Sequence, residues 1–245
     1  MTKSAVQALQ LNFVAERVNA LDWPSLTASL DQRGYAVAER LLNVAECRAL
    51  ATMDSDDAFR RRVVMAKHGF GRGEYRYFAY PLPSIVSALR EAFYPWLSTI
   101  ANAWSERLEQ HTRFPATHAE FLSRCHAAGQ TQPTPLLLRY GPGDYNCLHQ
   151  DLYGEQVFPL QLAVLLAEPG EDFSGGEFVL TEQRPRRQTR VEVCPLRRGD
   201  AIVFAVHHRP AQGTRGVYRV NLRHGVSEIR SGERHTLGII FHDAL

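Results

Sequence analysis

The stretch that decides the fold runs from Leu136 to Asp151 and reads LLLRYGPGDYNCLHQD. An apolar run is followed by a Gly-Pro-Gly-Asp turn at 141–144, and the stretch closes on His-Gln-Asp. Residues two apart in a strand point to the same face. We therefore predict that His149 and Asp151 offer an imidazole and a carboxylate to one point in space. A divalent metal accepts such a pair and needs a third ligand from elsewhere in the chain.

The composition is that of an ordinary globular protein. The chain has 245 residues, of which 44% are hydrophobic and 22% charged, which is enough for a large core in one domain, with or without a small helical lobe. The four cysteines show no paired spacing, so we expect reduced thiols that act as small core side chains, and a cytoplasmic location. The N-terminal residues are a poor signal peptide, and no apolar run is long enough to span a bilayer.

The net charge of +2 is unevenly distributed along the chain. Residues 60–78 contain six Arg or Lys and one acid, residues 184–198 contain six Arg and one acid, and residues 209–223 contain four Arg and no acid. The remainder of the chain is therefore acidic overall. Such asymmetry predicts an anionic partner more strongly than the total charge does.

Apolar spacing predicts mostly helices in the first half of the chain and short strands in the second. Apart from one strand at 35–38, we expect helices over residues 1 to about 20, a short one to Gln32, 43–53, 84–110 with an interruption at Tyr94-Pro95, and 117–128. Eight strand-like runs follow: 136–140, 147–151, 157–166, 176–181, 190–194, 201–206, 216–224 and 234–242. This series predicts a sandwich or jelly roll.

The organisational boundary is expected in the polar, proline-containing link between these two halves. Residues 1–133 would form a helical support with a lid over the substrate, and residues 134–245 would form the catalytic core. We expect the two parts to make one integrated domain.

The third metal ligand has five histidine candidates after Asp151. They are His207, His208, His224, His235 and His242. Only His224 is followed ten residues later by a basic residue, Arg234. This offset selects His224.

These residues resemble the signature of the Fe(II)- and 2-oxoglutarate-dependent oxygenases, in which HxD is followed after a long gap by His and then, about ten residues later, by Arg. The Gly-Gly-Glu run at 175–177 and the Gly-Asp pair at 199–200 are similar to the prolyl 4-hydroxylase-like branch. The segment RYGPGDYNCLHQD resembles AlkB-type nucleic-acid demethylases. The whole chain is similar to a bacterial oxygenase family proposed to demethylate damaged DNA oxidatively.

The resemblance implies an α+β protein with a double-stranded β-helix (jelly roll) core and N-terminal helices packed against it. It implies that His149, Asp151 and His224 bind Fe(II), that Arg234 and Tyr140 bind 2-oxoglutarate, and that O₂ takes the remaining position, with ascorbate as an accessory reductant. Two histidines and one carboxylate leave three positions of an octahedral iron open, and a guanidinium suits a buried carboxylate.

The segment at 60–78 has two readings. It is either a solvated loop or a nucleotide-recognition lid, in which Arg72, Tyr75 and Tyr77 would contact phosphate and base. The leading hypothesis for the substrate is an alkylated nucleic acid base, in DNA or RNA, with no membrane and no protein partner. AlkB-type enzymes place a second arginine beyond the cosubstrate arginine, and none follows Arg234 here.

Two alternatives stay open at this point. The same iron centre would serve a protein side-chain (prolyl-type) or small-molecule hydroxylase. A jelly roll that binds metal as a non-catalytic sensor is the alternative of another class.

Overall fold

The computed structural model describes residues 13–152 and 154–245. Its longer helices are α2 (Trp23–Arg33), α3 (Val44–Ala51), α4 (Ser84–Arg107) and α5 (His118–Ala127). Short 3-10 turns occur at η1 (Asp56–Ala58) and η2 (Met65–Lys67). Of the helix expected over residues 1 to about 20, residues 13–19 are helical, and residues 1–12 lie outside the described residues. None of the described helices is both long and apolar enough to cross a membrane.

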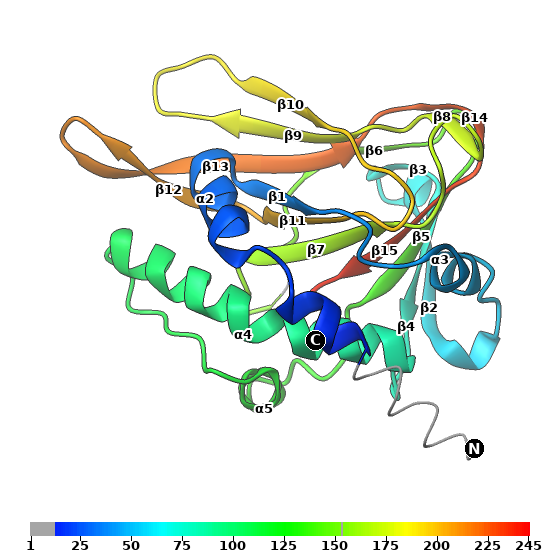
Figure 1. The fold of residues 1–245 in the computed structure, drawn as a ribbon, viewed down its shortest axis with the longest axis horizontal. Helices are drawn as coiled ribbons and strands as arrows, with labels where there is room; N and C mark the ends of the chain where they lie inside the picture. The colour runs from blue at the N-terminus through cyan, green and yellow to red at the C-terminus, as the bar shows by residue number, and fades with distance from the viewer. Residues whose placement is uncertain (1–12, 153) are drawn as a thin grey trace.

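Two antiparallel sheets form the body of the molecule (Figure 1). The larger sheet has, in spatial order, β1 (Tyr35–Ala38), β11 (Ala201–Ala205), β7 (Leu160–Leu165), β15 (Arg234–Ile239), β5 (Leu136–Tyr140), β4 (Glu74–Phe78) and β2 (Phe59–Val64). The smaller sheet has β10 (Arg190–Cys194), β9 (Phe178–Gln183), β13 (Gly216–Val226), β6 (Tyr145–His149) and β3 (Gly71–Arg72), and β12 (His208–Gly213) also pairs with β13. A small ribbon joins β8 (Phe173–Gly175) to β14 (Ile229–Gly232).

This arrangement is the predicted α+β jelly roll. Strands β1, β2 and β4 come from the N-terminal half of the chain, yet they belong to the same sheet as β5, β7 and β15. The basic segment at 60–78 contains a hairpin of β2 and β4, with Arg62 opposite Arg76. Strands β8, β12 and β14 were not predicted, because they are short and owe their pairing to partners distant in sequence.

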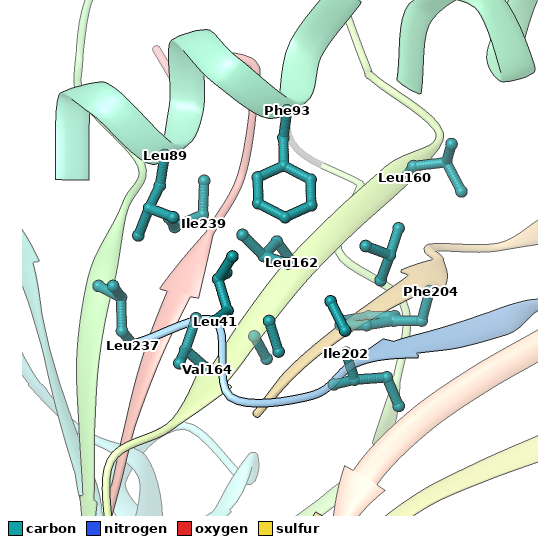
Figure 2. Close-up of a cluster of buried hydrophobic side chains, with 14 of the residues drawn as sticks. Leu41, Leu89, Phe93, Leu160, Leu162, Val164, Ile202, Phe204, Leu237 and Ile239 are labelled. Atoms are coloured by element: carbon teal, nitrogen blue, oxygen red, sulfur yellow. The ribbon is translucent and has the colours of Figure 1, made fainter. Parts of the chain in front are cut away.

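Helix α4 covers the outer face of the larger sheet. Figure 2 shows Leu89 and Phe93 of α4 pointing toward Leu162 of β7 and Ile239 of β15, and all four side chains are at most 1% exposed. Burying each of them stabilises the fold by roughly 1.5–3 kcal/mol. Because side chains alternate along a strand, the opposite face of the same sheet is free to line a cavity between the two sheets.

The interruption predicted at Tyr94-Pro95 is wrong. The helix α4 runs unbroken from Ser84 to Arg107 with Pro95 inside it. Proline removes one backbone hydrogen bond and costs about 3 kcal/mol in a helix interior. Phe93, Tyr94 and Leu97 are fully buried on either side of it, so tertiary packing outweighs that cost.

Candidate metal and cosubstrate site

Three side chains meet between the two sheets. One potential ligand atom from each of His149, Asp151 and His224 lies within 4.8 Å of the other two. The Nε2 atom of His149 is 3.4 Å from Asp151 Oδ1, and the Nε2 atom of His224 is 3.5 Å from Asp151 Oδ2. Two imidazoles and one carboxylate thus converge on one point, as the sequence predicted. This is a donor set of the facial-triad type.

Strand pairing explains how residues so far apart in sequence meet. His149 ends β6 and pairs directly with His224 of β13, and a register shift follows between His224 and Val226. The ring centroids of the two histidines are 4.2 Å apart. Gly225 sits in this irregularity, where an added Cβ would lie 2.7 Å from the carbonyl oxygen of Asn146. Glycine therefore permits the close approach of the two strands that bear the imidazoles.

Asp151 reaches the site from a loop segment and not from the predicted strand. We expected a strand over 147–151, but β6 ends at His149 and Asp151 lies in the segment beyond it. The intervening Gln150 turns away and donates from Nε2 to the carbonyl oxygen of Leu222 at 2.7 Å and to Asn221 Oδ1 at 3.2 Å. These bonds tie the segment between the two ligands to the strand that carries His224.

Electrostatics favour an anionic carboxylate between the two imidazoles. Burial by itself raises the pKa of Asp151, but its contacts with His149 and His224 outweigh burial and hold that pKa well below the usual range. Burial lowers the pKa of His224, with the charge of His149 acting in the same direction. A neutral imidazole and an ionised carboxylate are the forms that bind metal.

The orientation of His149 is fixed by its second nitrogen. The Nδ1 atom lies 2.8 Å from the carbonyl oxygen of Cys147, so Nδ1 carries the proton and donates. The lone pair of Nε2 then faces Asp151. A metal-binding histidine is commonly held in this way by a carbonyl group on its far side.

Arg234 and Tyr140 form a second cluster on the larger sheet. They are directly paired on β15 and β5, and the guanidinium carbon lies 5.8 Å from the centre of the Tyr140 ring. Both side chains are at most 2% exposed. Arg234 donates from Nη1 to Thr236 Oγ1 at 2.5 Å. Among the described residues, no carboxylate makes an ion pair with this buried guanidinium.

Burial has the largest effect on the pKa values of both residues in this second cluster. Burial lowers the pKa of Arg234 to about 10, while Tyr140 and Glu177 oppose the shift. Burial also raises the pKa of Tyr140, and the charge of Arg234 and the amide of Asn146 oppose that rise. Arg234 Nε and the Tyr140 hydroxyl lack a partner with hydrogen-bond geometry in the described part of the chain. A buried cation with unused donors is costly unless an anion joins it.

Two glycines allow the backbone to pack closely against the side chains of Arg234 and Tyr140. Gly176, from the Gly-Gly-Glu run, has φ +65°, and an added Cβ would lie 2.2 Å from Ile229 Cδ1 and 2.9 Å from Arg234 Cδ. Gly73 has φ +113°, and an added Cβ would lie 2.7 Å from the Tyr140 ring. Both positions need a residue without a side chain.

One cavity of about 340 Å³ joins the two clusters. It is lined by His149, Asp151 and His224 at one part and by Tyr140, Arg234 and Thr236 at another. Phe178 and Phe204 also line it and flank the His224 ring, with centroids 6.0 and 4.6 Å away. The site therefore combines a few polar groups with apolar walls, as small-molecule sites usually do.

The predicted substrate residues divide between the cavity and the surface. Tyr75 and Tyr77 of β4 line the cavity, with ring centroids 5.2 Å apart in an edge-to-face arrangement. Arg72 is exposed on β3 and is not a lining residue. The short strand β3 pairs with β6, and the role of Arg72 as a phosphate contact stays a prediction.

Two lining residues were missed from the sequence. Gln161 of β7 is 4% exposed and its Nε2 lacks a partner among described residues; it is the one polar residue in the apolar run LQLAVL. Thr236 lies two residues beyond Arg234 on the same strand, so period-two spacing puts it on the same face. Both signals, the single polar residue in an apolar run and the two-residue spacing from Arg234, are present in the sequence. Cys147 was expected in the core but is exposed.

Comparisons with known proteins agree with the site. The model of a family named Oxygenase-NA, described as "Oxygenase, catalysing oxidative methylation of damaged DNA", matches residues 73–244. Two curated proteins from Mycobacterium tuberculosis strains, both described as uncharacterized, are each 45% identical over 190 residues, which cover 76% of this chain and 82% of theirs.

Solved structures share the fold. A 2OG-Fe(II) oxygenase-family oxidoreductase from Burkholderia pseudomallei aligns with a TM-score of 0.52 and 15% identity over 92% of this chain and 94% of its own. A prolyl 4-hydroxylase from Phytophthora capsici aligns with a TM-score of 0.50 and 18% identity over 91% of this chain and 63% of its own. The chain belongs to the Oxygenase-NA family of oxygenases, and it shares the fold of 2OG-Fe(II) oxygenases.

Proposed function

We propose that this oxygenase removes alkyl groups from nucleic acid bases by hydroxylating the carbon attached to nitrogen. The observation that carries the proposal is the convergence of His149, Asp151 and His224 in a cavity that also contains an uncompensated arginine. The family description, which names damaged DNA, supports the substrate class. Oxygen insertion at a methyl group leads to its removal, so the expected outcome is demethylation.

The three side chains would hold Fe(II). His149 and His224 would bind through Nε2, and Asp151 through its carboxylate, which the surrounding imidazoles keep ionised. When bound, the iron centre together with 2-oxoglutarate and O₂ supplies the oxidising power to replace a C–H bond with C–OH.

Arg234 would bind the far carboxylate of 2-oxoglutarate. A buried guanidinium with an unused Nε donor gains a partner when a carboxylate enters, and a charge-assisted, bidentate pair is the strong form of that contact. Thr236 already accepts from Nη1 and so orients the guanidinium. The Tyr140 hydroxyl and Gln161 Nε2 offer two further groups without partners in the described chain.

The cavity mouth suits a flat, aromatic base. Phe70, Tyr75, Tyr77 and Leu148 line the cavity, and Phe70 and Leu148 remain 48% and 47% exposed. Cys147 donates its backbone N–H to the carbonyl oxygen of Phe70 at 3.0 Å, which fixes this aromatic residue beside β6. Base-modifying enzymes take the target base out of the stack and hold it between aromatic or apolar side chains.

The product chemistry follows from the position of the new hydroxyl group. Hydroxylation of an N-methyl carbon gives a hemiaminal, N–CH₂–OH. Its O–H proton is lost, the C–N bond breaks with its electron pair moving to nitrogen, and the nitrogen takes up a proton. Formaldehyde and the free base result, while 2-oxoglutarate leaves as succinate and CO₂.

A turnover assay with several substrates tests this proposal. Purified protein with Fe(II), ascorbate and 2-oxoglutarate is given N-methylated single-stranded DNA, the same DNA without methyl groups, a proline-containing peptide, or no substrate. We expect formaldehyde with methylated DNA only, accompanied by an equal amount of succinate above the level formed without substrate. Succinate stimulated by the peptide without formaldehyde would instead indicate a side-chain hydroxylase, and no succinate under any condition would indicate a non-catalytic metal-binding protein.

A further inference from the structure

The outer face of the smaller sheet carries a second feature. Strand pairing brings Asn221 of β13 opposite His208 of β12 on one side and opposite Gln183 of β9 on the other. Arg219 and Arg223, each two residues from Asn221, share its face by period-two alternation. Val220, Leu222 and His224 alternate with them, point to the opposite face and are buried there. The arginines therefore occupy the back of the strand that carries His224.

Two shallow grooves run along this face and share Gln183 and Asn221. One, of about 290 Å³, is lined by Gln183, Arg184, Pro185, Arg186, His208, Arg219 and Asn221. The other, of about 190 Å³, is lined by Thr181, Gln183, Thr189, Asn221 and Arg223. Neither groove has a carboxylate among its described lining residues. Apart from Pro185, the lining residues are basic or neutral and polar.

Three of the arginines here are without an acidic partner. Arg186, Arg219 and Arg223 are exposed, and none of them makes an ion pair with any described residue. Arg184 differs, because its Nε lies 2.5 Å from Glu182 Oε1. By contrast, Arg62, Arg76 and Arg139, on the larger sheet, are each paired with an acid. Three guanidinium groups without an ion pair among the described residues therefore lie together on the back of the smaller sheet.

This face is linked to the metal site through Gln150. Its Nε2 donates to Asn221 Oδ1, while the residue itself stands between His149 and Asp151 in the chain. Arg219 is five residues from His224, which is about 17 Å along a strand. In a duplex-like strand, with one phosphate per 3.4 Å, that length spans roughly five phosphates. A nucleic acid lying along β13 on this face would therefore reach the level of His224, with the metal site on the other side of the sheet.

We propose that the outer face of the smaller sheet, built around Arg186, Arg219 and Arg223, is the binding surface for the phosphate backbone of a single-stranded nucleic acid. The proposal rests on the proposed function, since it assigns the substrate's backbone to a surface and its base to the cavity. Exposed guanidinium groups bind phosphates by charge-assisted bonds, and the polar side chains of Gln183, Thr189 and Asn221 supply contacts that do not depend on sequence. The surface would supply affinity for the nucleic acid and fix its position along β13, while the cavity would select the base.

The first test measures binding without turnover. A fluorescein-labelled, unmethylated oligodeoxythymidine of about 20 nucleotides is titrated with the full chain at several salt concentrations, and anisotropy is read. The test variant is Arg219→Glu/Arg223→Glu. The matched control is Arg48→Glu/Arg113→Glu, which makes the same charge change at two exposed arginines on α3 and in the α4–α5 connection.

We expect the Arg219→Glu/Arg223→Glu variant to bind at least tenfold more weakly than the wild type, and the control to bind within about twofold of it. In the neutral variant Arg219→Ala/Arg223→Ala, the slope of log affinity against log salt should fall by about 1.4, because each lost phosphate contact contributes about 0.7 for a single strand. Equal affinity of wild type and test variant would overturn the proposal, as would equal losses in test and control.

A second readout separates this proposal from the proposed function. Decarboxylation of 2-oxoglutarate without substrate should be unchanged in the Arg219→Glu/Arg223→Glu variant, because neither arginine lines the cavity. If methylated DNA gives no formaldehyde while the oligonucleotide still binds through this face, the demethylation proposal fails and the surface proposal stands. If an acidic peptide binds the face more tightly than the oligonucleotide does, the surface belongs to a different class of partner and the proposal is wrong.

Discussion

His149 and His224 are directly opposed residues on β6 and β13, with their ring centroids 4.2 Å apart. Their Nε2 atoms lie 3.4 and 3.5 Å from the two oxygens of one carboxylate, that of Asp151. Two strands of one sheet therefore supply both imidazoles in a fixed register, and the segment after β6 supplies the acid. Because the sheet holds these three ligand side chains in place, a metal ion can bind to them without rearrangement of the site.

Asp151→Asn should weaken divalent metal binding by a factor of 100 or more. The amide carries no charge and replaces the anion that both imidazoles face. Titration of the metal-free protein with Mn(II), followed by calorimetry, measures the effect. His207→Asn is the control, because His207 is a half-buried histidine that does not line the cavity. Unchanged Mn(II) affinity in Asp151→Asn would show that metal binds elsewhere.

Arg234→Lys should raise the KM for 2-oxoglutarate about tenfold, and Arg234→Ala should raise it further, with a smaller effect on kcat. Lysine keeps the charge but loses the planar, bidentate geometry of the guanidinium. The assay is the decarboxylation of 2-oxoglutarate at varied cosubstrate concentration. Arg139→Lys is the control, since Arg139 lies next to Tyr140 on β5 but is exposed and paired with Glu233. The same KM in wild type and Arg234→Ala would show that the arginine was wrongly assigned.

Gly73→Ala should lower the free energy of unfolding by about 2–4 kcal/mol, from backbone strain and steric overlap together. The new Cβ would lie 2.7 Å from the Tyr140 ring at φ +113°. Gly170→Ala, at φ +84° and with no atom of the other described residues beyond its chain neighbours within 4 Å of the new Cβ, should cost only about 1 kcal/mol of strain. Urea unfolding gives both values. Equal destabilisation of the two variants would argue against tight packing of Gly73 on Tyr140.

Acidification below pH 6.5 should destabilise the fold through His118. Burial lowers the pKa of His118 to about 3, with the positive charge of Arg90 acting in the same direction. The ring is 5% exposed and donates from Nε2 to the carbonyl oxygen of Phe241 at 2.8 Å. Between pH 6.5 and about 3, the unfolded chain binds a proton that the folded chain does not, so stability rises with pH there by up to about 1.4 kcal/mol per unit.

The measurement is the urea midpoint between pH 8 and pH 5, for wild type and His118→Gln. The variant should be less stable at pH 8, because a packed hydrogen-bonded ring is lost, but its midpoint should change less with pH. His126→Gln is the control, because its ring is part-exposed and lies 2.9 Å from Asp243 Oδ2. A midpoint that falls as steeply in His118→Gln as in the wild type would exclude His118 as the source.

Much of the site could be predicted from the sequence because its signals are local or have a fixed offset. The His-x-Asp triplet and the ten-residue spacing from His224 to Arg234 identified residues that the structure brings together. The strand assignment of Asp151 was wrong, since the end of β6 depends on its pairing with β13. Composition suggested Arg72, Tyr75 and Tyr77 together as substrate contacts, but composition does not say which side of a strand faces inward, and only the two tyrosines line the cavity.

The fold was predictable in class but not in all its parts. Alternating and apolar runs predicted most strands of the two sheets, and the helix expected over 117–128 is α5, where Thr117 and Glu120 cap each other. The unbroken α4 at Pro95 could not be predicted, because its stability comes from packing against β7 and β15. The basic back face of β13 likewise emerges only when β9, β12 and β13 are aligned in register.

The most direct test of the central claim is a crystal structure of the protein soaked with Fe(II) under anaerobic conditions, with an anomalous difference map collected at the iron edge. The account predicts one strong peak within bonding distance of His149 Nε2, His224 Nε2 and a carboxylate oxygen of Asp151, inside the cavity that also holds Arg234. A map with no peak among these three side chains, or with its main peak at another site, would contradict it.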